Sequence, residues 1–176
     1  MFEELNAPQK SFADYLADRR IMVTGAPKSG THWVADLCRS CGWLVLHLHQ
    51  PYCKGSVVPA VCVYRHPKNM LISMCRHRGD EVNTGNLAQW MLNYYHGRDL
   101  VAVYGEYLGY STHKGPNVFI INFEDLVAGA PSPDSATKTG SHSDWRDHWN
   151  GELEQCWRTI GGTELEQTLT DRGIIN

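Results

Sequence analysis

The chain has 176 residues, 42% of them hydrophobic and 20% charged, which fits a single globular domain over residues 1–176. Its net charge of −3 at pH 7 excludes a general electrostatic attraction to nucleic acid, so an anionic ligand would need a local cluster of basic side chains. The apolar runs are far shorter than the roughly 18 residues of a membrane span, and residues 1–20 lack the apolar segment of a signal peptide. We therefore expect a cytoplasmic protein, monomeric or homodimeric, with neither nucleic acid nor a membrane as partner.

Helices and strands are predicted to alternate along the chain. One or two short helices precede residue 20, a buried strand at 21–24 ends at Gly25, and a helix runs from about 31 to 41. Apolar runs predict further strands at 43–48, 61–64 and 118–121, and the first two of these runs indicate a sheet covered on both faces. Pro67 opens a helix, 87–107 is typical of one long helix, 128–143 of a loop, and 145–169 of helix broken at Gly161-Gly162. This order predicts an α/β fold with a central parallel sheet of four to five strands flanked by helices.

Cysteine usage leaves two possibilities open. Six cysteines occur, and Cys38 and Cys41 form a CxxC pair inside a predicted helix. Secreted disulfide scaffolds are shorter and denser in cysteine, and no second pair mirrors this one. The spacing is compatible with a redox or zinc role and with two buried, reduced thiols.

The segment GAPKSGTHW, which begins at Gly25, lies between a predicted strand and a predicted helix. Such a turn presents backbone N–H groups and a helix N-terminus to an anion, while Lys28 adds a positive charge. In a Walker A loop the lysine follows the last glycine, whereas here Lys28 precedes Gly30. We predict an anion site that is not a Walker A loop; a Gly-Pro turn with a surface lysine is the alternative.

This segment resembles the PKSGTxW loop that grips the 5′-phosphosulfate in sulfotransferases that use 3′-phosphoadenosine 5′-phosphosulfate (PAPS). The resemblance implies a three-layer P-loop NTPase-like domain, PAPS as sulfuryl donor, PAP as product, and no metal requirement. Trp33 is then a candidate platform for adenine, with core packing behind the loop as the alternative. The resemblance assigns cofactor contacts to Pro27, Lys28, Ser29, Gly30, Thr31, His32 and Trp33.

A second segment, YRHPKNMLIS, is similar to the R-[NH]-P-x-D-x-x-x-S segment of the same family, whose arginine and serine bind the 3′-phosphate. Arg65 and Ser73 keep that spacing, and Asn69 replaces the aspartate. Because Arg65 leaves a strand and Ser73 lies about two turns into the next helix, both can reach one phosphate.

Looser matches follow in the family's order. Phe123, in INFEDL, stands where an adenine-contacting tyrosine would be, and a KTG tripeptide before a DWR tripeptide resembles the segment that covers the nucleotide. Residues 152–173 resemble the closing helix pair, so the resemblance extends from about residue 21 onward. It adds cofactor contacts at Phe123, Lys138, Thr139 and Gly140.

The segment LHLHQP resembles the K-T-H-x-P segment of the family, which makes His49 the general base and places His47 where a lysine stands. An acceptor hydroxyl must lose its proton as it attacks sulfur, and a neutral imidazole can accept that proton. Lys28 would neutralise charge on the leaving phosphate. The catalytic candidates are thus Lys28, His49 and His47; the alternative is that the two histidines form half of a metal site, for which no third ligand is identifiable.

The acceptor is expected to be a small molecule or a carbohydrate, bound in an open site because segments 79–117 and 127–138 are trimmed relative to typical family members. An aromatic set could line the acceptor pocket, although at least half of it should be core: Trp90, Tyr94, Tyr95, Tyr104, Tyr107 and Tyr110. We expect Arg76, Arg78, Arg98 and the six remaining histidines to be surface groups. Two other functions stay open: a protein that binds PAPS or PAP without transfer, and a P-loop nucleotide kinase, which the position of Lys28 disfavours.

Overall fold

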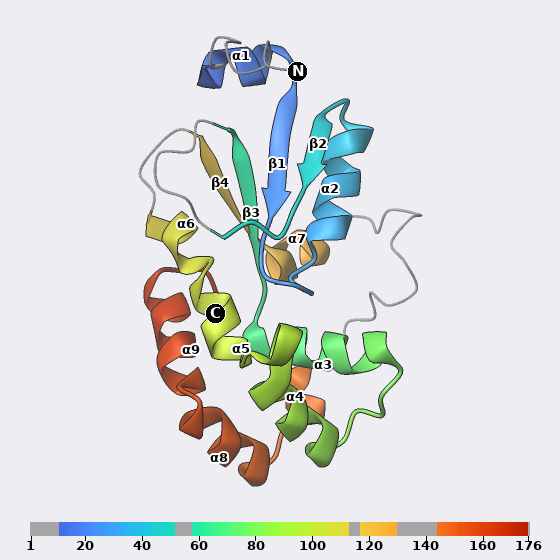
Figure 1. The fold of residues 1–176 in the computed structure, drawn as a ribbon, viewed down its shortest axis with the longest axis vertical. Coiled ribbons are helices and arrows are strands. Elements are labelled where there is room, and N and C mark those ends of the chain that lie inside the picture. The colour runs from blue at the N-terminus through green and yellow to red at the C-terminus, as the bar shows by residue number, and fades with distance from the viewer. Residues whose placement is uncertain (1–10, 52–57, 113–116, 130–143, 176) are drawn as a thin grey trace, which may run out of the picture.

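Four parallel strands form one sheet in the order β2-β1-β3-β4 (Figure 1). The computed structural model describes residues 11–51, 58–112, 117–129 and 144–175. Because every pairing in the sheet is parallel, the carboxyl ends of the strands lie at one edge. The predicted α/β fold with a parallel sheet is confirmed. Its strands are β1 (Arg20–Thr24), β2 (Leu44–His47), β3 (Ala60–Tyr64) and β4 (Val118–Asn122).

The order of the strands creates a switch point between β1 and β3. From β1 the chain passes through α2 (Thr31–Ser40) to β2 at one edge, and it then crosses to β3 on the other side of β1. In parallel sheets, ligands bind outside the carboxyl ends of the strands at such a point. The two segments with predicted phosphate contacts, after β1 and after β3, therefore meet there.

Alternate residues of the central strands face two separate cores, which makes three layers. Val23, Val61 and Val63 pack with α2 and with α7 (Phe123–Gly129) on one face. Met22 and Cys62 face the larger core on the opposite side, which the remaining helices build. The sheet is thus covered on both faces, as the apolar runs predicted.

The edge strands are less covered than the sequence predicted. All five residues of β3 are buried, but Leu44 in β2 is 62% exposed and Phe119 in β4 is 48% exposed. An apolar run therefore identified the strands, while its length did not distinguish a central strand from an edge strand.

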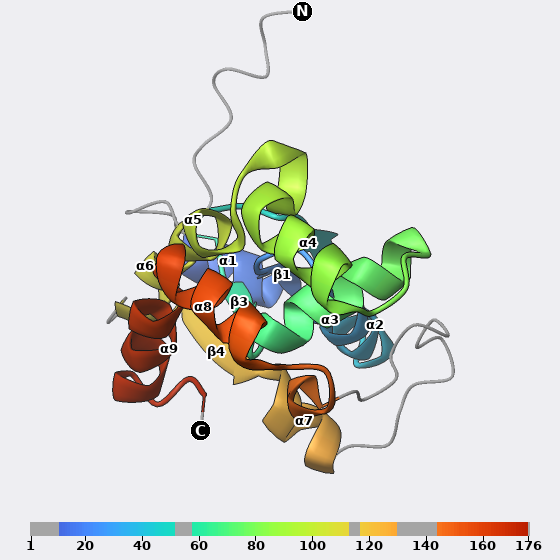
Figure 2. The ribbon, with the colours of Figure 1, turned by 90° about the horizontal axis from the view of Figure 1, so that it is seen from below.

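The helices of the larger core gather beyond the carboxyl ends of the strands, as Figure 1 shows. In both views α8 and α9 lie side by side and α4 lies against α3 (Figures 1 and 2). Gly161 has φ 81°, and a Cβ on Gly162 would lie 2.1 Å from the Trp157 ring, so the predicted break between the last two helices is confirmed. The helices on this side and at the N-terminal end are α1 (Phe12–Ala17), α3 (Pro67–Arg78), α4 (Thr84–Gly97), α5 (Leu100–Gly105), α6 (Leu108–Thr112), the short 3₁₀ turn η2 (Trp145–Asp147), α8 (Gly151–Thr159) and α9 (Gly162–Asp171).

The long helix expected at 87–107 is two helices. The backbone from Asn93 to His96 leaves helical geometry, with φ of 41° at Tyr95 and 57° at His96, and α5 begins after Asp99. Tyr94 is fully buried there, and its hydroxyl donates to the carbonyl of Pro27 in the loop after β1. A tertiary contact therefore overrides the helical pattern at this point.

Within the described ranges, no helix combines the length and apolar character needed to cross a membrane. Cys38, in α2, and Cys41, at its C-terminal cap, are both free thiols. Burial raises the pKa of Cys38, which disfavours the reactive thiolate. The described residues also contain no group of three or more His, Cys, Asp or Glu side chains placed to hold a metal ion.

Candidate functional site

The loop from Gly25 to Gly30 has a backbone that requires its glycines. Gly25 has φ 152°, and a Cβ there would lie 2.5 Å from the carbonyl oxygen of Val63. Gly30 has φ 98°, and its Cβ would lie 2.1 Å from the ring of Phe123. Lys28 also has a positive φ, 70°, which a non-glycine residue adopts rarely. The loop is therefore fixed in an uncommon conformation at the carboxyl end of β1, as active-site loops often are.

The loop ends at the N-terminus of α2. Gly30 is the N-cap residue and makes no side-chain cap, so the first N–H groups of this ten-residue helix have no capping side chain. The positive end of the helix dipole adds to the attraction for an anion. Lys28, Gly30, Thr31 and His32 line the adjoining cavity, so the backbone and side-chain donors face one space.

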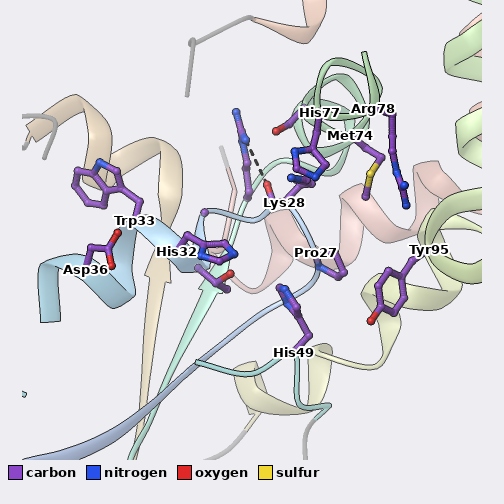
Figure 3. A pocket seen from close by; sticks show the side chains of 14 residues that line it. Pro27, Lys28, His32, Trp33, Asp36, His49, Met74, His77, Arg78 and Tyr95 are labelled. Carbon is purple, nitrogen blue, oxygen red and sulfur yellow. Dashed lines mark hydrogen bonds between the residues drawn. The ribbon is translucent and has the colours of Figure 1, made fainter. Parts of the chain in front are cut away.

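That cavity has a volume of about 580 Å³ and a basic lining, although the chain is acidic overall (Figure 3). Asp36 is the acidic side chain among the described lining residues, and Arg39 holds it at 2.7 Å. This is the local basic cluster that an anionic ligand would require. The basic lining residues are Lys28, His32, His49, Arg65, His77 and Arg78.

Lys28 lies at the centre of the cavity in Figure 3. Burial lowers the pKa of its ammonium group, and the nearby Arg78 guanidinium lowers it further. Both effects oppose the charged form of Lys28. A bound anion would favour the charged form, and the ammonium group would in turn stabilise the anion.

Arg65 and Ser73 line the same cavity, as the second segment predicted. Arg65 follows β3, and its side chain is 11% exposed; Nη1 donates to the carbonyl of Lys28 at 3.3 Å. Its guanidinium lies 4.9 Å from the centre of the Phe123 ring and its Nε lies 3.7 Å from Glu124 Oε1. These contacts hold Arg65 against the loop, so the loop and the start of α3 present cations to one ligand.

Asn69, which stands where the resembled segment has an aspartate, joins three elements of the structure. Asn69 Nδ2 donates to Glu124 Oε1 at 3.0 Å, and Asn69 Oδ1 accepts from the backbone N–H of Trp145 at 3.0 Å. An aspartate would not donate and would place a second carboxylate beside Glu124. The asparagine therefore joins the start of α3, α7 and η2 without charge repulsion.

His49 follows β2 and lines the cavity. Its Nδ1 lies 2.8 Å from the carbonyl oxygen of Gly25. A carbonyl can only accept, so Nδ1 carries the proton and Nε2 of the neutral ring is left as an acceptor. The next residue is fixed as well, because Thr24 Oγ1 donates to Gln50 O at 2.9 Å and accepts from Gln50 N at 3.0 Å.

His47 is in β2 and does not line the cavity. Its ring centre lies 4.2 Å from that of His32 and 5.6 Å from that of His49, and its Nε2 is buried with no hydrogen-bond partner among the described residues. Burial, followed by the charges of His32 and His49, lowers the pKa of His47 to about 4. The structure therefore keeps a neutral His47 out of the cavity lining, and of the two histidines only His49 lines the cavity.

Three further cofactor candidates occupy different positions. Trp33 lines the cavity, with its ring edge-on to Phe123 at 6.2 Å. Phe123 does not line it, but packs against Gly30 and beneath Arg65. Ser29 is fully buried, facing Gly25 and not the cavity, and its hydroxyl has no partner among the described residues. Pro27 and Thr31 line the cavity, whereas Lys138, Thr139 and Gly140 lie outside the described residues.

The start of α3 is held by a buried lysine that the sequence analysis did not single out. The side chain of Lys68 is 4% exposed, and Nζ lies 3.2 Å from both Glu154 and Glu166. Three tryptophan rings surround the ammonium group at 4.3, 4.7 and 5.7 Å: Trp145, Trp149 and Trp157. The indole N–H groups of Trp149 and Trp157 donate to the same two glutamates. We call this set the Lys68 cage; it fixes α3 to η2, α8 and α9.

His66, expected at the surface, is part of this support. It caps α3 by accepting from Lys68 N at 3.3 Å through Nδ1, and its Nε2 lies 3.4 Å from Glu166. Burial lowers the pKa of His66 to about 4. A neutral ring with the proton on Nε2 satisfies both contacts.

The sequence analysis also missed part of the cavity wall. Met74, His77 and Arg78 line it; the last two are exposed, as expected, but their place at the cavity was not predicted. They lie one residue, four residues and five residues after Ser73, which is one face of a helix. Helical spacing from Ser73 would have found them. Of the aromatic set, Tyr95 lines the cavity while Tyr94, Tyr104, Tyr107 and Tyr110 are buried, which confirms that at least half of the set is core.

Comparison with known proteins gives a likeness in structure but not in sequence. No protein-family model and no curated protein sequence matches the chain. Among solved structures, mouse sulfotransferase SULT7A1 complexed with PAP is similar, with a TM-score of 0.43 and 17% sequence identity over 83% of this chain. The match covers 64% of the length of that neighbour. The chemical interpretation of the site therefore depends on the loop, the cavity and the side chains described above.

Proposed function

We propose that the chain is a sulfotransferase that moves the sulfuryl group of PAPS to a hydroxyl or amine of a small-molecule or carbohydrate acceptor. The observation that carries the proposal is the shared cavity, into which the loop lysine, the Arg65–Ser73 pair and an imidazole with an accepting nitrogen all face. Anion contacts alone would suit many ligands. Their combination with a positioned base favours group transfer.

The residues present fit a nucleotide with phosphates at both ends of the ribose. Arg65 and Ser73 would hold the 3′-phosphate, because Arg65 offers forked donors and Ser73 a hydroxyl. The loop and the N-terminus of α2 would hold the 5′-phosphosulfate, because Gly30 caps the helix without a side chain and the first N–H groups of α2 have no capping side chain. Trp33, on the cavity wall, offers a face for adenine.

The chemistry then divides between two side chains. His49 Nε2 takes the proton from the acceptor hydroxyl as its oxygen bonds to sulfur. The bond between sulfur and the 5′-phosphate oxygen breaks, its electron pair stays on PAP, and Lys28 stabilises that charge. His47, which does not line the cavity, can act only by supporting its neighbours.

We propose that the transfer needs no divalent metal, because Lys28 and Arg65 supply positive charge and Asp36 is held by Arg39. EDTA should leave the rate unchanged. Loss of activity in EDTA that Mg²⁺ or Zn²⁺ restores would contradict this part of the proposal.

Calorimetry with PAP and with ATP plus Mg²⁺, followed by transfer assays with ³⁵S-labelled PAPS and a panel of acceptors, tests the proposal. We expect PAP to bind tightly, ATP weakly, and label to reach an acceptor. PAP binding without transfer to any acceptor would indicate a nucleotide-binding protein, and tight binding of ATP with Mg²⁺ would indicate a kinase. The cytoplasmic location, and a monomeric or homodimeric state, remain predictions.

A further inference from the structure

The cavity has a second group of cations on the side away from Trp33. Figure 3 shows Trp33 and Asp36 on one side of Lys28, and Arg78 and Tyr95 on the other. His77 and Arg78 come from the last turn of α3, on the same helix face as Ser73. If the nucleotide occupies the loop, Arg65 and Trp33, the space left for an acceptor is bounded by His49, Met74, Tyr95, His77 and Arg78.

These cations have no carboxylate partner among the residues that the structure describes. Six of the described arginines lie within 4.0 Å of an aspartate or glutamate oxygen, but no such contact joins Arg78 or His77 to any described carboxylate. The charge of Lys28 is the largest cause that lowers the pKa of His77, and Arg78 also acts on Lys28. The side chains therefore repel one another across the space where the acceptor would lie.

Stabilisation of the helix end does not account for this arrangement. Basic residues in the last turn of a helix favour its dipole, and Arg76, His77 and Arg78 all lie in the last turn of α3. The dipole acts on all three, yet only His77 and Arg78 line the cavity. Their position beside Met74 and Tyr95 instead provides a pocket that is partly apolar and carries a charge at its rim.

We propose that the acceptor carries an anionic group, such as a carboxylate, sulfate or phosphate, which Arg78 binds with the help of His77. This inference rests on the proposed sulfotransferase function, because the nucleotide defines which part of the cavity the acceptor occupies. The acceptor hydroxyl would face His49, its body would lie along Tyr95 and Met74, and its anion would neutralise the cations of α3. Neutral phenols and sugars would bind less well.

The test compares charged acceptors with neutral counterparts, bound to the protein saturated with PAP. Calorimetry measures the Kd of 4-hydroxyphenylacetate against 4-hydroxyphenylacetamide, and of glucose 6-sulfate and glucose 6-phosphate against glucose. A charge-assisted hydrogen bond corresponds to roughly tenfold or more in Kd, so we expect each anion to bind at least about tenfold more tightly than its neutral partner. The carboxylate, sulfate and phosphate arms identify which anion is preferred.

Variants then locate the preference. Arg78→Gln should reduce the ratio of the two Kd values to nearly one, Arg78→Lys should restore part of it, and Arg98→Gln, an exposed arginine paired with Glu106 outside the cavity, should leave it unchanged. Equal binding of both members of every pair by the wild type would overturn the inference, as would a preference that survives in Arg78→Gln. If PAP itself does not bind, the proposed function fails, and the inference fails with it.

Discussion

Replacement of His49 by asparagine separates the roles of its two ring nitrogens. Nδ1 donates to the carbonyl of Gly25 at 2.8 Å, and the amide nitrogen of asparagine can take the same place. His49→Asn should therefore keep the contact with the loop and lose the accepting Nε2. A positioned general base contributes about 10²- to 10⁴-fold, so kcat should fall by about 100-fold or more, while the Kd for PAP stays within about twofold.

Single-turnover transfer of ³⁵S from PAPS, with an acceptor that the wild type sulfates, measures this change. The matched control is His47→Asn, which removes a neighbouring imidazole from outside the cavity and should cost far less. Wild-type turnover by His49→Asn would show that the base is another group.

Three other predictions concern binding and stability. Arg65→Ala should weaken PAP binding by roughly tenfold or more in calorimetry and change AMP binding little, because AMP lacks the 3′-phosphate; equal losses for both nucleotides would contradict the assignment. Lys68→Met leaves the partly buried Glu154 and Glu166 without their cation, so urea unfolding should show a loss of about 1–3 kcal/mol, and a loss below about 1 kcal/mol would be incompatible with the cage. Burial lowers the pKa of His66 from 6.5 to about 4, so the unfolded chain binds a proton between these pH values while the folded chain does not. The free energy of unfolding should fall by about 3 kcal/mol from pH 7 to pH 4 through this group, and His66→Asn, which keeps a capping acceptor, should remove that part.

The sequence predicted those parts of the site that local chemistry determines. A glycine-rich turn between a strand and a helix has few backbone solutions, so the loop from Gly25 to Gly30 could be located from residue types alone. Pro67 at the first position of α3 marked the helix that carries Ser73, and the spacing of Arg65 and Ser73 brought both to one cavity. These predictions depend on interactions within a few residues.

Predictions failed where a distant contact decides the structure. The aromatic run in α4 has helical spacing, but the buried hydroxyl of Tyr94 binds the carbonyl of Pro27, and the chain leaves the helix to make that contact. The same turn brings Tyr95 to the cavity. No pattern along the helix reveals a hydrogen bond to a residue 67 positions away.

The predictions for the edge strands and for His66 failed for a similar reason. Leu44 and Phe119 belong to apolar runs, and their exposure depends on which strand lies at an edge of the sheet, which is a property of topology. His66 and His77 were both expected at the surface; His77 is exposed and lines the cavity, whereas His66 is largely covered as a helix cap. Only the positions of α8, α9 and the loop distinguish the two histidines.

The C-terminal helices act on the site although none of their described residues lines the cavity. The Lys68 cage joins η2, α8 and α9 to the first turn of α3, directly after Arg65. A helix moves as a rigid unit, so a fixed first turn also fixes Ser73 and Arg78 farther along the same face. Asn69 strengthens this junction, because it binds both Glu124 and the backbone of η2 without adding a charge. The C-terminal helices therefore contribute to the site through the tryptophans and carboxylates that hold α3 in place. A variant that loosens the Lys68 cage should weaken PAP binding as well as stability.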